Sequence, residues 1–276
     1  MSTIRTSPTQ TSPTRTLAST ARESWLVTGR DLRHWLRDPW TPVFGMAFSV
    51  MLVLVFGYLF GGAVALPGGG DYLAYLLPGM LALSMMFGVE STMAAMATDS
   101  RRGVMDRFRS LPMSGVAVPL GRALADLLNS AVQLAVLMGG GLLIGWSVSG
   151  SLVDAFVAVG LLLWLRFAVL WLGIFLGLAF RSEGAMVAVQ VLVWPIGFLS
   201  GVIVPPETMP GWLGVVADLN PVSATAAACR ELFGNPSGIT EGLLADHALL
   251  LAVAWPAVLT AVFVPLSVRA FRRLGA

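Results

Sequence analysis

Two ionisable side chains, Glu90 and Arg166, lie well inside long apolar runs of the sequence. In an apolar environment such a side chain is costly unless it is paired or hydrated, so each marks a candidate functional site. We expect the two to form a structural ion pair. A role in binding substrate or in relaying protons is the alternative.

Further polar side chains interrupt other apolar runs. Asp126, Asn129 and Gln133 are spaced i, i+3, i+7, which places them on one side of a helix. They could line an aqueous vestibule, and hydrogen bonding to a neighbouring helix is equally open. Gln190 is another polar residue within an apolar run.

The motifs that would indicate enzyme catalysis or nucleotide binding do not occur in this sequence. All 17 basic residues are Arg, so a phosphate-binding loop, which needs Lys, is excluded. His34 and His247 are expected near opposite faces of the membrane, so they cannot share a site, and neither G-x-S-x-G nor H-E-x-x-H occurs. The single Cys229 can form neither an internal disulfide nor a metal cluster. We therefore expect a non-catalytic chain that holds no metal, and any ATP would be bound by another polypeptide.

The composition is that of an all-α integral membrane protein. Mean hydropathy is +0.80, and only 12% of residues are charged. A bilayer core of about 30 Å needs about 20 apolar residues in helical form. Six transmembrane helices are predicted, at residues 42–64, 72–98, 118–146, 152–180, 184–204 and 245–268.

Arginine is concentrated in three segments: the amino-terminal arm, the link after the second run and the carboxyl tail. With six alternating spans these segments share one side of the membrane, and arginine-rich segments remain cytoplasmic. Both termini are therefore expected in the cytoplasm. The opposite side carries Arg230 alone.

Residues 22–39 predict an amphipathic helix that lies in the membrane interface. Its apolar face comprises Trp25, Leu32, Trp35 and Leu36, and charged residues cover the other side. A plain membrane-surface anchor is an equally open interpretation. The Ser-, Thr- and Pro-rich residues 1–21 before it are expected to form a disordered cytoplasmic tail, and residues 40–273 form the transmembrane domain.

Residues 99–114, DSRRGVMDRFRSLPMS, gather charge between two apolar runs and also show a helical rhythm. Val104, Phe108 and Leu111 are spaced i, i+4, i+7 along one face, and Pro112 would end the helix. A loop that binds anionic lipid headgroups would explain the arginines but not the apolar stripe. The alternative is a short cytoplasmic helix that docks into another protein. The residues assigned to this coupling role are Asp99, Arg101, Arg102, Gly103, Val104, Asp106, Arg107, Phe108, Leu111 and Pro112.

The segment 205–238 is too polar to span the membrane and too apolar for a free loop. One short helix is expected around Trp212, after Met209-Pro210, and a second after Asn220-Pro221.

Glycine pairs at i, i+4 permit close helix packing without identifying a particular contact. They are Gly57 and Gly61, Gly141 and Gly145, Gly173 and Gly177, and Gly197 and Gly201.

Three stretches together resemble the type-2 ABC transporter permeases, and most closely their daunorubicin-resistance branch. Residues 99–114 resemble the family's coupling segment through Asp99, Gly103, Asp106, Pro112 and Ser114, while Val104 and Phe108 replace its usual Thr and Leu. Residues 203–234 resemble its external region through Met209, Pro210, Trp212, Asn220, Pro221, Arg230 and Gly234. Residues 22–42 resemble its entry helix.

This resemblance implies the membrane subunit of an exporter in a bacterial plasma membrane, with an external re-entrant helical hairpin before the last span. Separate ATPase subunits would bind ATP and magnesium, and a second copy or a homologous permease would complete the pathway. The implied cargo is hydrophobic or amphipathic: a drug, a lipid or a lipid-linked glycan. Nucleic acid is not an expected partner. A proton-coupled secondary transporter that uses Glu90 and Arg166 is the alternative.

Overall fold

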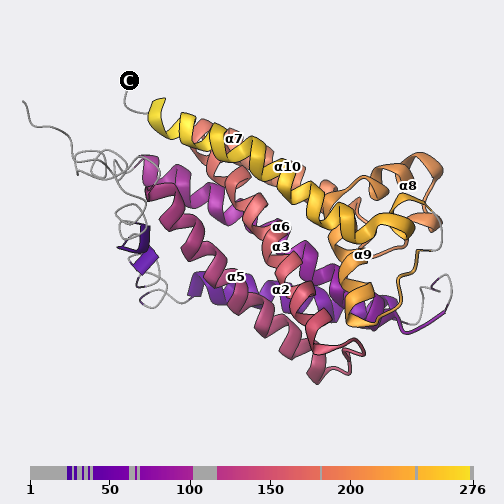
Figure 1. Ribbon diagram of the computed structural model, residues 1–276. Helices are drawn as coiled ribbons and strands as arrows, with labels where there is room; N and C mark the ends of the chain where they lie inside the picture. The colour runs from indigo at the N-terminus through magenta and orange to yellow at the C-terminus, as the bar shows by residue number, and fades with distance from the viewer. Residues whose placement is uncertain are drawn as a thin grey trace, which may run out of the picture.

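A computed structural model describes residues 24–26, 28–29, 33, 37, 40–61, 66, 69–101, 117–180, 182–239 and 242–273 (Figure 1). Secondary structure within these residues is helical throughout, as expected for the all-α class. The helices are α2 (Trp40–Phe60), α3 (Tyr72–Arg101), α5 (Ala117–Leu143), α6 (Leu152–Ala179), α7 (Glu183–Phe198), the 3-10 helix η1 (Pro206–Thr208), α8 (Gly211–Asp218), α9 (Pro221–Phe233) and α10 (Leu243–Arg273).

Five of these helices are long and apolar enough to cross a membrane: α2, α3, α5, α6 and α10. They coincide with five of the six predicted spans. The remaining predicted span, the fifth at residues 184–204, contains α7, whose 16 residues end at Phe198. At about 1.5 Å per residue such a helix is about 24 Å long, shorter than a bilayer core of about 30 Å. The chain turns at residues 199–204 instead of extending the helix, so the count of six spans stays a prediction.

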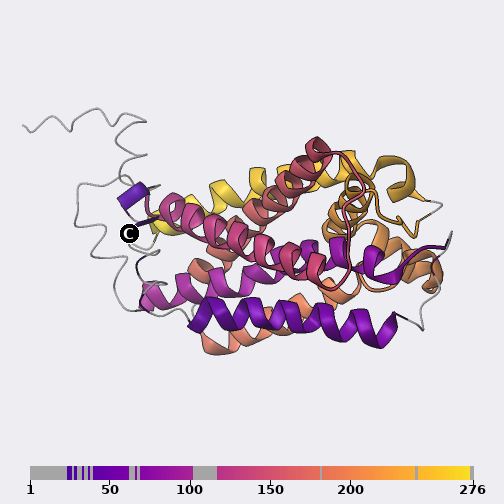
Figure 2. The same ribbon diagram turned by 90° about the horizontal axis from the view of Figure 1, so that it is seen from below.

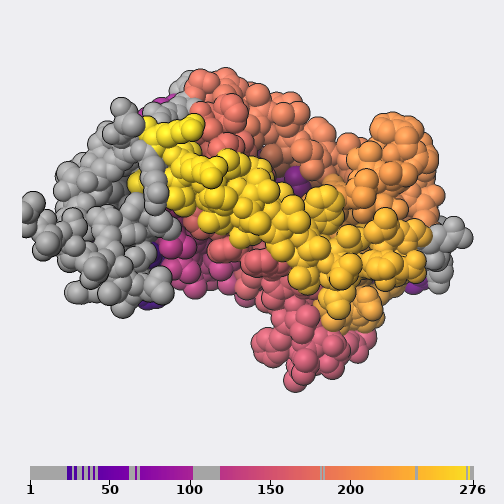
Figure 3. Space-filling view, turned by 45° about the horizontal axis from the view of Figure 1, so that its top comes forward, coloured from indigo at the N-terminus to yellow at the C-terminus, as the bar shows by residue number. Residues whose placement is uncertain are grey.

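The central helix of the bundle is α3, which packs against α2, α5, α6, α7 and α9. Of its apolar window, 78% is buried inside the chain, compared with 11% for the windows of α2 and α10. Helix α10 forms a ridge across one face of the molecule (Figure 3). The outer helices therefore present apolar surface to the surroundings, which in a membrane are lipid or another subunit.

One of the predicted glycine pairs forms the contact between α6 and α3. A Cβ atom added to Gly173 would lie 3.0 Å from the Val89 carbonyl oxygen, and one added to Gly177 would lie 2.6 Å from the Met93 carbonyl oxygen. Glycine thus allows the two backbones to touch. The paired positions rise together along both helices, so α3 and α6 run in the same direction.

The bundle has two distinct ends. The carboxyl-terminal ends of α3, α6 and α10 lie at one end, and α8 and α9 lie at the other (Figures 1 and 2). The carboxyl-terminal end of α3 and the amino-terminal end of α5, which flank the predicted coupling segment, therefore lie at the same end of the bundle as the last turns of α10.

Helix α9 begins and ends at strong sequence signals. The Asn220 side chain accepts a hydrogen bond from the Val222 amide, and Pro221 occupies the first helical turn. Gly234 ends the helix with a left-handed φ of 68°. Helices thus lie at both positions expected in the segment 205–238.

Few residues of the predicted interface helix belong to the described part of the chain. Trp25 is 63% exposed, while the Thr28 hydroxyl donates a hydrogen bond of 2.9 Å to the Gly121 carbonyl of α5. Leu32, Trp35 and Leu36 lie outside the described residues, so the amphipathic face itself stays a prediction.

Candidate functional site

Arg166 occupies the middle of α6, where its guanidinium is surrounded by polar groups from two other helices. Its Nε donates a hydrogen bond of 2.8 Å to the Ser130 hydroxyl of α5. Its Nη2 donates one of 3.1 Å to the Thr92 hydroxyl of α3 and lies 4.0 Å from Asp126 Oδ2 of α5. Only 3% of Arg166 is exposed. Such a buried cation requires these partners, because an unpaired charge in the interior is strongly destabilising.

Asp126 is the carboxylate at the centre of this group. Its Oδ2 accepts a hydrogen bond of 2.8 Å from the Thr92 hydroxyl, and its Oδ1 lies 3.2 Å from Nε of Arg122, one turn earlier on α5. Two arginines therefore share one carboxylate, and the more distant of them is Arg166. We call Thr92, Asp126, Ser130 and Arg166 the Arg166 cluster.

Gly88 provides the space that the cluster needs. A Cβ atom at this position of α3 would overlap the guanidinium of Arg166. One turn later on the same face, the Thr92 hydroxyl contacts the same guanidinium. On the side of α3 that faces α6, Gly88 thus leaves room for the guanidinium and Thr92 provides a hydroxyl that accepts its hydrogen bond.

The expected ion pair between Glu90 and Arg166 is wrong. Glu90 lies two residues from both Gly88 and Thr92, which is about 200° around the helix from the face that meets Arg166. Its Oε1 is buried and has no hydrogen-bond partner among the described residues. Because Glu90 lies on a different face of α3, the carboxylate near Arg166 is that of Asp126 on α5.

The other predicted polar residues do not join the cluster. Gln133 donates a hydrogen bond of 3.1 Å to the Ser49 hydroxyl of α2. Hydrogen bonding to a neighbouring helix is one of the two roles predicted for it. Asn129 is half-buried and Gln190 is exposed on α7. Thr92 and Ser130 were missed, and the only available signal was their position one turn after Gly88 and Asp126.

The Arg166 cluster connects the helices on either side of the predicted coupling segment. Helix α3 leads into residues 102–116 and α5 follows them, and both contribute side chains that bind Arg166 of α6. Of the coupling residues, Asp99 and Arg101 end α3, and Arg101 Nη2 lies 3.7 Å from Met186 Sδ of α7. The remaining coupling residues, Arg102 to Pro112, lie outside the described part of the chain.

A second buried arginine, Arg230 of α9, lies at the opposite end of the bundle. Its Nε donates a hydrogen bond of 2.8 Å to the Tyr75 carbonyl, and its Nη2 donates to the carbonyls of Gly201 and Val202 at 3.0 and 3.1 Å. The guanidinium also lies 3.6 Å from the centroid of the Tyr75 ring. We call this the Arg230 site. It joins α9 to α3 and to the turn after α7.

The other residues assigned to the external segment shape its helices. Met209 ends η1 and Pro210 precedes α8. Trp212 is 72% exposed on α8. Besides capping α9, Asn220 donates a hydrogen bond of 2.8 Å from Nδ2 to the Ile196 carbonyl of α7. Helix α8 is thus the exposed member of the pair and α9 the buried one.

Comparison with known proteins agrees with this architecture. A family model described as ABC-2 type transporter matches residues 22–233. The chain is 36% identical over 228 residues to the daunorubicin resistance ABC transporter permease protein DrrB1 of Streptomyces coeruleorubidus. This match covers 82% of the present chain and 78% of that protein. The chain is 25% identical over 224 residues to the probable doxorubicin resistance ABC transporter permease protein DrrC of Mycobacterium tuberculosis, with 78% of each chain covered.

Another relative is the putative transport permease ycf38 of Cyanophora paradoxa, which is 26% identical over 214 residues. This match covers 75% of the present chain and 73% of that protein. The relatives are transport permeases, in keeping with a chain that is not itself an enzyme. The family model covers most of the chain and includes the predicted coupling segment. This multi-pass membrane protein therefore belongs to the ABC-2 type transporter permease family.

Proposed function

We propose that this chain is the permease subunit of an ATP-driven exporter that moves a hydrophobic or amphipathic substrate across a bacterial plasma membrane. Drugs, lipids and lipid-linked glycans are the substrate classes. A separate ATPase subunit binds ATP and magnesium, and a second permease, either a copy or a homologue, completes the pathway.

The observation that carries this proposal is the position of the Arg166 cluster. A force applied to residues 102–116 reaches the membrane through α3 and α5. Both helices bind the same guanidinium on α6, so their displacement is passed to α6 through Arg166. Such an arrangement suits an external motor that acts on residues 102–116, and this is what supports the proposal.

Docking is tested by co-purification with the ABC-type ATPase subunit that the proposal requires. Replacing Phe108 by Ala or Asp106 by Asn should remove the ATPase from the purified complex, because both residues belong to the predicted docking helix. Phe156→Ala is the matched control, since Phe156 is 77% exposed near the start of α6, at the other end of the bundle. An intact complex in both docking variants would contradict the proposal.

The energy source is tested by following efflux of daunorubicin, chosen because a relative is named for resistance to it. Depletion of ATP should stop efflux while an uncoupler leaves it in place. Efflux that survives ATP depletion and collapses with the uncoupler would favour the proton-coupled alternative instead.

The proposed topology has six spans, with α7 as a short fifth span and both termini in the cytoplasm. It is testable because Cys229 is the sole cysteine and Cys229→Ala provides a cysteine-free background. A cysteine at Gly211 should react with an external, membrane-impermeant maleimide, whereas one at Ser182 should not. Labelling of both positions would show that α7 does not cross.

A further inference from the structure

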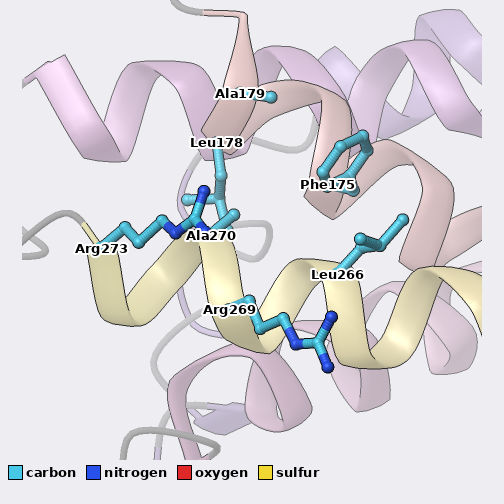
Figure 4. A pocket seen from close by; sticks show the side chains of 7 residues that line it. All are labelled: Phe175, Leu178, Ala179, Leu266, Arg269, Ala270 and Arg273. Atoms are coloured by element: carbon cyan, nitrogen blue, oxygen red, sulfur yellow. The ribbon is translucent and has the colours of Figure 1, made fainter.

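A pocket lies between the last turns of α6 and α10, outside the Arg166 cluster and the coupling segment (Figure 4). Its volume is about 430 Å³, within the range of about 300–1,000 Å³ typical of small-molecule sites. Phe175 and Leu178 from α6 and Leu266 from α10 form apolar walls. Arg269 and Arg273 from α10 supply positive charge.

The two arginines lie one turn apart on α10, with the guanidinium of Arg273 beside Leu178 and that of Arg269 extending away from it (Figure 4). They are spaced i, i+4, so they follow one another on the same face of α10. Neither guanidinium forms an ion pair with a carboxylate in the described part of the chain. Guanidinium groups bind phosphate oxygens in bidentate fashion, and two of them suit a phosphate better than a single carboxylate.

The apolar walls distinguish this pocket from a site for a hydrated anion. The side chains of Phe175, Leu178 and Leu266 are hydrocarbon, and they would remove water from any ion that entered. A ligand that carries both a phosphate and hydrocarbon satisfies the whole lining. The pocket also lies at the carboxyl-terminal ends of two helices that are long and apolar enough to cross a membrane, and basic pockets between such helices bind anionic headgroups.

We propose that this pocket binds the phosphate headgroup of an anionic phospholipid, with Arg269 and Arg273 on the phosphate and the lipid's apolar part between α6 and α10. The lipid stabilises the contact between these helices. This site does not depend on the identity of the exported cargo.

The test measures thermal unfolding of the purified full chain in detergent after addition of defined lipids. Phosphatidylglycerol should raise the unfolding temperature and phosphatidylcholine should not. Inorganic phosphate alone should also give no rise, because it lacks the apolar part. An equal rise with phosphatidylcholine, or a rise with inorganic phosphate that matches phosphatidylglycerol, would overturn the proposal.

The double variant Arg269→Gln/Arg273→Gln should bind phosphatidylglycerol about 30-fold more weakly, on the basis of the usual contribution of each arginine to anionic lipid binding. Arg33→Gln/Arg37→Gln is the matched control. It removes the same charge at the same spacing from two exposed residues that do not line the pocket. The control should stay within about twofold of the native chain. Equal losses in both double variants would mean general attraction to charge and would refute a specific site.

A filling variant separates the pocket from its charge. Ala179 lines the pocket at the exposed end of α6, so Ala179→Trp should block the lipid while both arginines remain. Loss of the phosphatidylglycerol effect is the expected result. Binding as tight as in the native chain would place the lipid elsewhere.

Discussion

Arg166 and Arg230 are both buried arginines, but their partners differ in kind. Arg166 is held by side chains, two hydroxyls and a carboxylate shared with Arg122. Arg230 is held by three backbone carbonyls and the face of an aromatic ring. Side chains can exchange partners when helices shift, whereas carbonyls of the backbone cannot move separately from it. We interpret the Arg166 cluster as an adjustable joint and the Arg230 site as a fixed anchor.

The largest effect is expected at the anchor. Arg230→Met would remove three hydrogen bonds to buried backbone carbonyls, of which only that of Gly201 keeps the Tyr75 hydroxyl as a donor, and it should lower the free energy of unfolding by about 3–5 kcal/mol. Chemical denaturation in detergent measures this loss. Glu231→Gln, at the exposed neighbouring residue, should change stability by less than about 0.5 kcal/mol. A similar stability for both variants would show that the carbonyls do not need the guanidinium.

A slightly smaller effect is expected at the joint, and unlike the first it can be reversed. Asp126→Leu removes the carboxylate that two arginines share and should cost about 3 kcal/mol. Adding Arg166→Met should restore at least about half of that loss, because a buried ion pair can be replaced by apolar residues at little cost. The comparison fails if the double variant is no more stable than Asp126→Leu alone.

The space reserved for Arg166 gives the next prediction. Gly88→Ala would push a methyl group into the guanidinium and should cost about 1–3 kcal/mol. Gly139→Ala is the matched control, because an added Cβ there meets no atom within 4 Å. Both substitutions add the same methyl to a helix, so equal unfolding free energies would show that Arg166 relocates freely.

The smallest effect tests one hydroxyl of the anchor. The Tyr75 hydroxyl donates a hydrogen bond of 2.7 Å to the Gly201 carbonyl. Tyr75→Phe removes this bond but keeps the ring beneath Arg230, so it should lower the free energy of unfolding by about 1 kcal/mol. A loss as large as that of Arg230→Met would mean that the hydroxyl, and not the guanidinium, holds the site.

The sequence was sufficient to find the charged residues of the joint but not to pair them. Arg166 and Asp126 were both marked as polar residues within apolar runs. Ionisable character alone favours Glu90 as the partner, because the sequence does not state which face of α3 meets α6. That face depends on the packing of Gly173 and Gly177 against α3, which is a tertiary contact.

Some helix ends can likewise be predicted from neighbouring residues in the sequence, whereas others depend on tertiary contacts. Asn220-Pro221 and Gly234 are local signals, and they located α9. The fifth predicted span was too long, because apolar composition does not distinguish a helix from the buried turn at residues 199–204. Burial of that turn is explained by Arg230, whose side chain binds the carbonyls of Gly201 and Val202.

The central claim is that motion of the coupling segment reaches α6 through the Arg166 cluster. Its most direct test is to measure ATP hydrolysis and efflux together in the assembled complex with the Asp126→Leu/Arg166→Met permease. We predict that the ATPase stays bound and active while efflux falls at least about tenfold, which is a loss of about 1.4 kcal/mol of coupling. Efflux at the native rate in this variant would contradict the claim.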